Sequence, residues 1–170
     1  TSASNTTNIF TISSCVSERT GTNAYTDVAP SIAFVGDVYA VSNNPCVAST
    51  IMPLSSDKAA LKSKIDSLAI AGSTAGQIGI AWGWYMISPN FAYLWPSASQ
   101  PAAYGTDELM KIAVIMTDGE FNTAYCNGVI AKDSGSGSGN NADHINCNAT
   151  NGSSSSQALR LSSLISTSTS

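Results

Sequence analysis

The chain has 170 residues, of which 43% are hydrophobic and only 11% are charged. That length suits one domain with a sizeable core, and the hydrophobic fraction excludes a chain that is disordered throughout. Seven basic residues against eleven acidic ones leave a net charge of −4, and no basic cluster occurs, which argues against nucleic acid or an anionic membrane as a partner.

The four cysteines are Cys15, Cys46, Cys126 and Cys147, and none forms the Cys-x-x-Cys pair typical of zinc or thioredoxin-like sites. A charge-poor surface rich in Ser, Thr and Asn is typical of secreted proteins, so we expect two disulfides. Pairing Cys15 with Cys46 and Cys126 with Cys147 would close local loops, and it is one of three possible connectivities. The chain opens at Thr1 without an initiator Met, a signal peptide or a transmembrane run, so we expect a processed product or a fragment.

The first part of the chain favours loops over long regular elements. Residues 9–12 form one alternating stretch, which predicts a short strand or the end of one. Residues 15–30 hold turn formers throughout and predict a surface excursion. Residues 49–54 are a short apolar run that ends in Pro53 and Leu54, and they predict a further strand.

Three periodic stretches predict helices. Asp57 and the serines before it supply an N-cap and a first-turn acid, and Leu61, Ile65 and Leu68 follow at i, i+4 and i+7, so we expect an amphipathic helix over residues 56–69. A second helix is expected over 75–87. Its expected buried face consists of Ile78, Ala81, Trp82, Tyr85 and Met86. A third, short helix over 156–165 would place Ala158, Leu161 and Ile165 on one face.

Residues 112–116 form an unbroken apolar run in which three of the five positions are β-branched. Charged residues precede the run and Asp-Gly follows it, a pattern that predicts a strand buried on both faces. Thr117, Asp118 and Glu120 then come at the strand's C-terminal end, which is where ligands bind in open α/β sheets.

Three stretches in this order carry a resemblance to a known family. Pro-Leu-Ser-Ser-Asp at 53–57 precedes the first helix, Gly-Ser-Thr-Ala-Gly at 72–76 opens the second, and Val-Ile-Met-Thr-Asp-Gly-Glu fills 114–120. Together they resemble the C-terminal two-thirds of a von Willebrand factor A domain, and more narrowly the A-domain region of TadG-like proteins of bacterial tight-adherence (Tad/Flp) pilus assembly. The resemblance covers roughly residues 12–160.

The resemblance implies a metal-ion-dependent adhesion site built from three loops. By motif match Thr74 occupies the second loop and Asp118 the third, so a partial site for Mg²⁺ or Ca²⁺ is implied, since such hard cations take oxygen ligands. The Asp-x-Ser-x-Ser of the family's first loop is absent from this chain, as is the strand before it. Alternatively, Thr74 or Ser73 caps the second helix, and Asp118 forms a turn with the following glycine.

Two other features have both a functional and a structural interpretation. His144 is the only histidine, so any Ser-His-Asp or Cys-His mechanism would have to use it, whereas its Asn/Gly-rich surroundings indicate a surface side chain. The aromatic residues of the 82–104 region would serve either as a sugar or partner platform or, as is more usual, as core and loop anchors.

We therefore expect an α/β protein with a von Willebrand factor A-like (Rossmann-like) sheet flanked by helices, incomplete at both ends, with long disulfide-bearing loops. It would be a single unit over 1–170, with its core at about 31–130, a flexible loop at about 133–152 and a Ser/Thr-rich tail at 162–170. The resemblance implies a non-catalytic, secreted or cell-envelope bacterial domain that binds a protein in pilus assembly or surface adhesion. The alternative is a secreted hydrolase or carbohydrate-binding module that uses the aromatic loop 82–104. Self-association to complete the sheet is a further expectation.

Overall fold

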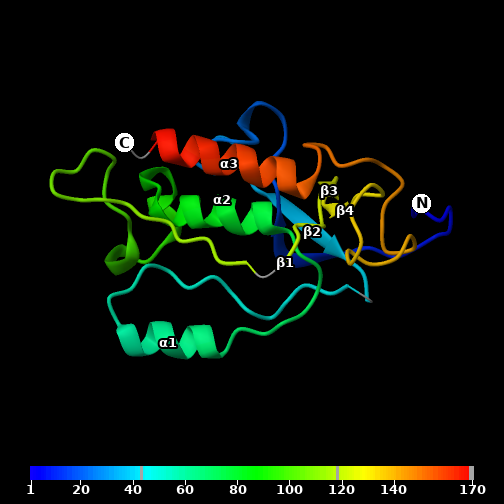
Figure 1. The fold of residues 1–170 in the computed structure, drawn as a ribbon, viewed down its shortest axis with the longest axis horizontal. Coiled ribbons are helices and arrows are strands. Elements are labelled where there is room, and N and C mark those ends of the chain that lie inside the picture. Colours follow the sequence, from blue (N-terminus) through cyan, green and yellow to red (C-terminus); the bar gives the residue numbers. More distant parts are fainter. Residues whose placement is uncertain (43, 118, 169–170) are drawn as a thin grey trace.

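The computed structural model describes residues 1–42, 44–117 and 119–168, with the side chain of residue 168 left out. Its strands are β1 (Thr11–Ser17), β2 (Gly36–Ala40), β3 (Tyr125–Cys126) and β4 (Val129–Ile130). Its α-helices are α1 (Lys58–Asp66), α2 (Gly76–Ile87) and α3 (Ser154–Ser168). Its 3-10 helices are η1 (Gly21–Asn23), η2 (Pro89–Leu94) and η3 (Ser97–Ser99). Figure 1 shows α2 and α3 side by side, the strands near one end of this pair, and α1 apart on the other side of α2.

The strands form two small antiparallel sheets. β1 pairs with β2, with an irregularity between Ile12 and Val16, and β3 pairs with β4 in a tight hairpin. Asn127 and Gly128 form the hairpin turn with φ values of 50° and 76°, as a two-residue loop of this kind requires. The backbone N–H of Tyr39 donates to the carbonyl of Gly128 at 2.8 Å, which joins the hairpin to β2.

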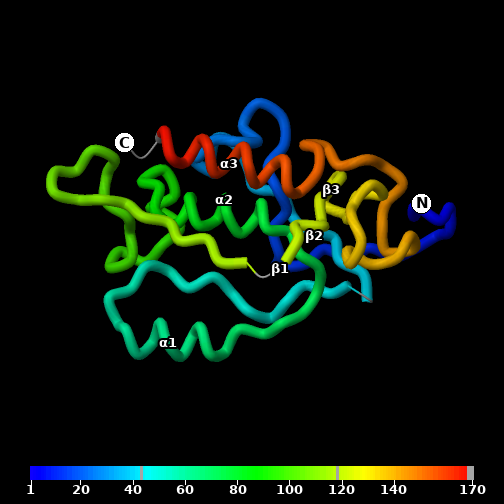
Figure 2. Tube along the Cα trace, in the orientation of Figure 1, coloured from blue at the N-terminus to red at the C-terminus, as the bar shows by residue number. Residues whose placement is uncertain are grey.

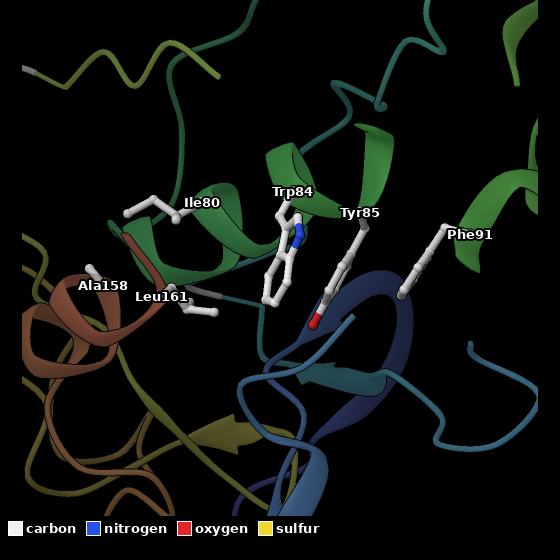
Figure 3. Packing of buried hydrophobic residues seen from close by; sticks show 6 residues of the cluster. All are labelled: Ile80, Trp84, Tyr85, Phe91, Ala158 and Leu161. Atoms are coloured by element: carbon white, nitrogen blue, oxygen red, sulfur yellow. The ribbon is translucent and has the colours of Figure 1, made fainter. Parts of the chain in front are cut away.

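The core lies between α2 and α3. Ile80 and Trp84 of α2 are buried with Ala158 and Leu161 of α3, and Ile165 packs against them (Figure 3). The spacing of the α3 residues matches the expected face, so that prediction is confirmed, although the helix is longer than expected and runs through the start of the expected tail.

Tyr85 and Phe91 complete this core from the end of α2 and from η2. Their rings lie nearly parallel, with centroids 4.1 Å apart, and Phe91 is fully buried (Figure 3). Helix α2 forms almost where the sequence places it, but Gln77, Ile80 and Trp84 are buried with Tyr85 instead of most of the expected face. The buried face differs because α2 packs on α3 and η2, whereas the prediction assumed a sheet.

Helix α1 forms as predicted but buries none of its side chains. The Oδ1 atom of Asp57 accepts from the N–H groups of Ala59 and Ala60 at 2.9 and 3.0 Å, so Asp57 is the N-cap itself and the helix begins two residues later than expected. Ile65 and Leu68 of the expected apolar face are nevertheless 66% and 55% exposed. Local capping therefore fixes this helix, while its apolar face has no covering layer among the described residues.

The stretch 112–116, expected to be a central buried strand, is neither a strand nor buried. Ile112, Val114 and Met116 are 67%, 80% and 90% exposed, and the stretch runs past α2 without regular structure (Figure 2). Residues 49–54, the other expected core strand, also form no strand. The reason is the same in both cases, because no strand among the described residues pairs with either stretch.

The two disulfides are Cys15–Cys46 and Cys126–Cys147, so the prediction of two disulfides is confirmed, and of the three possible connectivities the structure has the one that closes local loops. Such bonds persist in oxidising compartments outside the cytoplasm. No helix among residues 1–42, 44–117 and 119–168 is long and apolar enough to cross a membrane. The chain is thus a mixed α/β protein with two small antiparallel sheets and two disulfides.

Candidate functional site

Thr74, the second-loop residue of the expected metal site, lies exposed just before α2. Its carbonyl accepts from the N–H groups of Asn122 and Thr123 at 3.0 Å, and its own N–H donates to the Asn122 side chain. The N-cap of α2 is Ala75, with no side-chain cap, so neither Thr74 nor Ser73 caps this helix.

Asp118, the third-loop residue, lies outside the described residues. Within the described ranges, no three His, Cys, Asp or Glu side chains converge as they would around a metal ion. One exposed threonine hydroxyl is far from the six to eight oxygen ligands that Ca²⁺ takes or the octahedral shell of Mg²⁺. The described residues alone thus do not fit such an ion, and a site that includes Asp118 stays a prediction.

A buried acid links the strands to both packed helices. The Oε1 atom of Glu18 accepts from the backbone N–H of Tyr125 at 3.0 Å and from the Gln157 side chain at 3.3 Å. Close by, Gln77 donates to the carbonyl of Thr123 at 2.9 Å. Burial raises the pKa of Glu18, only partly offset by these hydrogen bonds, and it raises the pKa of Tyr125 to about 12.

Arg19, next to this acid, is only 3% exposed. Its guanidinium lies 5.2 Å from the ring centre of Tyr85 and 5.1 Å from that of Phe91, and it donates to the carbonyl of Thr26 at 3.2 Å. It is thus held against the aromatic core by cation–π contacts. Glu18 and Arg19 fall in the stretch expected to be a surface excursion, so that prediction is wrong for both. Hydropathy patterns assign charged residues to the surface, so they do not predict the burial of these two side chains.

A second polar cluster anchors the aromatic region. Asp27 Oδ2 accepts from the hydroxyls of Tyr104 and Ser88 at 2.6 and 2.5 Å and from the Asn90 side chain at 3.3 Å. Trp84 in turn donates to the Tyr104 hydroxyl at 3.2 Å. Burial, followed by its hydrogen bond to Asp27, raises the pKa of Tyr104. These side chains hydrogen-bond to one another within the protein, which is typical of a structural anchor.

The aromatic rings of the 82–104 region point mostly inward. Trp82 lies edge-on to Tyr85, Phe91 and Trp95, with centroids 5.6 to 6.3 Å apart, whereas Tyr93 is 57% exposed. A sugar platform needs ring faces open to solvent. The arrangement therefore favours the interpretation of this block as core and loop anchors.

His144 is buried, at 4% exposure, so the expected surface position is wrong. Its Nε2 atom lies 3.3 Å from the Ser138 hydroxyl and 3.2 Å from the Ser138 carbonyl. Ser138 is fully buried and donates to the carbonyl of Gly135 at 2.6 Å. A substrate cannot reach this pair, so we interpret it as a support for the glycine-rich loop around it.

A shallow pocket of about 270 Å³ opens beside the β1–β2 sheet. Phe34 and Tyr39 line it with 85% and 39% of their surfaces exposed, and Asp37 and Tyr125 contribute polar groups. Exposed aromatic side chains beside a concave, partly polar surface are typical of protein-binding surfaces. The sequence pattern does not indicate this pocket, because Phe34 lies in a stretch without a clear hydrophobic period.

A larger cavity of about 600 Å³ lies between residues 111–117, α2 and α3. Ile80, Ile87 and Phe121 contribute to its apolar lining. Gly79 and Gly83 also face open space, since a Cβ atom added at either would meet no atom within 4 Å.

In comparison with known proteins, no family model matches the chain, and neither does any curated protein sequence or solved structure.

Proposed function

We propose that this chain is a non-catalytic protein-binding domain of the secreted or cell-envelope compartment. The observation that carries the proposal is the pocket beside β2, where Phe34 and Tyr39 expose aromatic surface. An exposed Phe has an unfavourable contact with water that a partner would relieve, and aromatic residues often dominate binding energy in interfaces.

The polar clusters support a binding role over catalysis. Asp27 accepts hydrogen bonds from groups of the protein itself, and the His144 side chain contacts Ser138, which is fully buried. A general base needs to reach a substrate proton, and none of these side chains is placed to do so.

The finer assignment follows the resemblance to von Willebrand factor A domains of TadG-like proteins. On that basis the partner is a component of a bacterial Tad/Flp-type pilus or of the cell envelope, or a surface ligand, and the domain lies in the periplasm or at the cell surface. The two disulfides are compatible with this location. The same resemblance implies a Mg²⁺ or Ca²⁺ site at Thr74 and Asp118, and it also implies an A-like sheet, whereas the sheets of the described residues have two strands each.

The proposal is tested by measuring the affinity of the wild-type chain for purified pilin and envelope components of a Tad/Flp system that are immobilised on a surface. We expect one of them to bind, and Phe34→Ala to weaken that binding about tenfold or more, as for an aromatic hot spot of at least about 1.4 kcal/mol. Ile70→Ala is the matched control, because Ile70 is fully exposed far along the chain from the pocket.

Two outcomes would overturn the proposal. One is an absence of binding to all of these components together with turnover of ester or glycoside substrates. The other is binding that Phe34→Ala and Ile70→Ala leave equally strong, since the pocket beside β2 would then not be the binding surface.

A further inference from the structure

Residues 112–116 combine three properties that seldom occur together in a folded protein. Ile112, Val114, Ile115 and Met116 are between 49% and 90% exposed. The described residues give the backbone of this stretch no hydrogen-bond partner. The stretch is also rich in β-branched residues, which favour strands.

An unpaired row of N–H and C=O groups along an apolar stretch is the chemistry of a free strand edge. Such an edge pairs readily with another strand, because only a strand presents donors and acceptors at the matching spacing. A helix or a small molecule would leave most of these groups without partners. The missing partner is therefore a β-strand.

The surroundings indicate an uncharged partner strand. The cavity beside the stretch is lined by apolar and small residues, with no Asp or Glu among the described ones. Its one cation, Lys111, already donates to the carbonyls of Ile87 and Ala102 at 2.6 and 2.5 Å and lies 4.7 Å from the ring centre of Tyr104. A charged strand would find no counter-ion here.

We propose that the partner strand is residues 112–116 of a second copy of this chain, paired antiparallel about a two-fold axis at Val114. In this register Val114 faces its own equivalent, Ile112 faces Met116, and Lys111 faces Thr117. All the central pairs are apolar and no like charges stand opposite one another, which is the favourable pattern for cross-strand pairs.

A second copy is favoured as the partner because residues 112–116 of one copy form the free edge, and the same residues of another copy form an uncharged, exposed stretch that matches it. A two-fold interface requires such a self-complementary surface, and two-fold dimers are the commonest protein oligomers. The pairing does not rest on the proposed function, since the partner pocket at Phe34 lies on other residues. The binding assay with Phe34→Ala and the test of dimerisation can therefore fail independently of each other.

The test is light scattering of the oxidised wild-type chain at concentrations from about 1 μM to 1 mM, the range of weak interfaces. We expect the mass to rise from 17.5 kDa towards twice that value. Val114→Lys should stay monomeric because it places two cations opposite each other, and so should Val114→Glu. An equimolar mixture of the two variants should dimerise again, because opposite charges then face one another.

The controls keep the test decisive. Ile70→Lys carries the same added charge at another fully exposed position and should dimerise like the wild type. Circular dichroism checks the fold, and Met116→Lys, at a 90% exposed position, replaces Val114→Lys if that variant does not fold. A wild type that stays monomeric at all concentrations would overturn the proposal. Dimers that Val114→Lys leaves intact would overturn it too.

Discussion

Phe91→Ala is the sharpest test of the core described above. Phe91 is fully buried in η2, its ring stacks on Tyr85 at 4.1 Å, and the Arg19 guanidinium lies 5.1 Å from its centre. Truncation of a buried Phe to Ala costs about 3–5 kcal/mol, a sum of lost transfer energy and of the cavity left behind. The loss of the aromatic pair is part of that cost, at roughly 0.5–1.5 kcal/mol.

The effect should be large relative to the total stability, which is about 5–15 kcal/mol for a domain. At about 2–4 °C per kcal/mol for a chain of this size, the midpoint of thermal unfolding should fall by roughly 6–20 °C. The assay is urea unfolding of the oxidised protein, followed by circular dichroism, with a thermal scan alongside.

Tyr93→Ala is the matched control, because Tyr93 lies in the same η2 but is 57% exposed. Its truncation should change the free energy of unfolding by less than about 1 kcal/mol, as is usual for surface positions. Equal losses for the two variants, or a larger loss for Tyr93→Ala, would refute the assignment of Phe91 to the core. The aromatic region would then have to be reconsidered as an exposed platform.

Two further predictions concern a buried acid and two glycines. Burial raises the pKa of Glu18, so as the pH rises its carboxyl ionises first in the unfolded chain. The wild type should therefore lose stability relative to Glu18→Gln as the pH rises above the ordinary carboxyl pKa, measured by urea unfolding, and parallel pH profiles of the two proteins would contradict this. Gly128→Ala should destabilise the chain by about 1–3 kcal/mol, since its φ is 76° and a Cβ would lie 2.3 Å from the Asp37 carbonyl, whereas Gly83→Ala, in open space on α2, should stabilise it by about 0.5–1 kcal/mol. Thermal unfolding compares the two glycine variants, and a Gly128→Ala variant as stable as the wild type would contradict the hairpin geometry.

The sequence by itself determines where the helices form and that two disulfides are expected. The Ser-Ser-Asp stretch at 55–57 marks the start of α1 within two residues, and the spacing of Ala158, Leu161 and Ile165 predicts the buried face of α3. These predictions succeed because helical hydrogen bonds and caps join residues three or four positions apart, so the relevant partners are in the local sequence. The sequence predicts two disulfides, but which of the three possible connectivities forms is decided by the fold.

Only the tertiary structure decides what is buried and what pairs as a sheet. Residues 112–116 have the composition of a core strand, yet a strand exists only where a neighbour supplies hydrogen bonds, and no described segment does so. Glu18, Arg19 and His144 are polar, yet packing against α2, α3 and the glycine-rich loop takes them out of water. Burial and strand pairing join residues far apart in the chain, and for that reason the local pattern does not determine them.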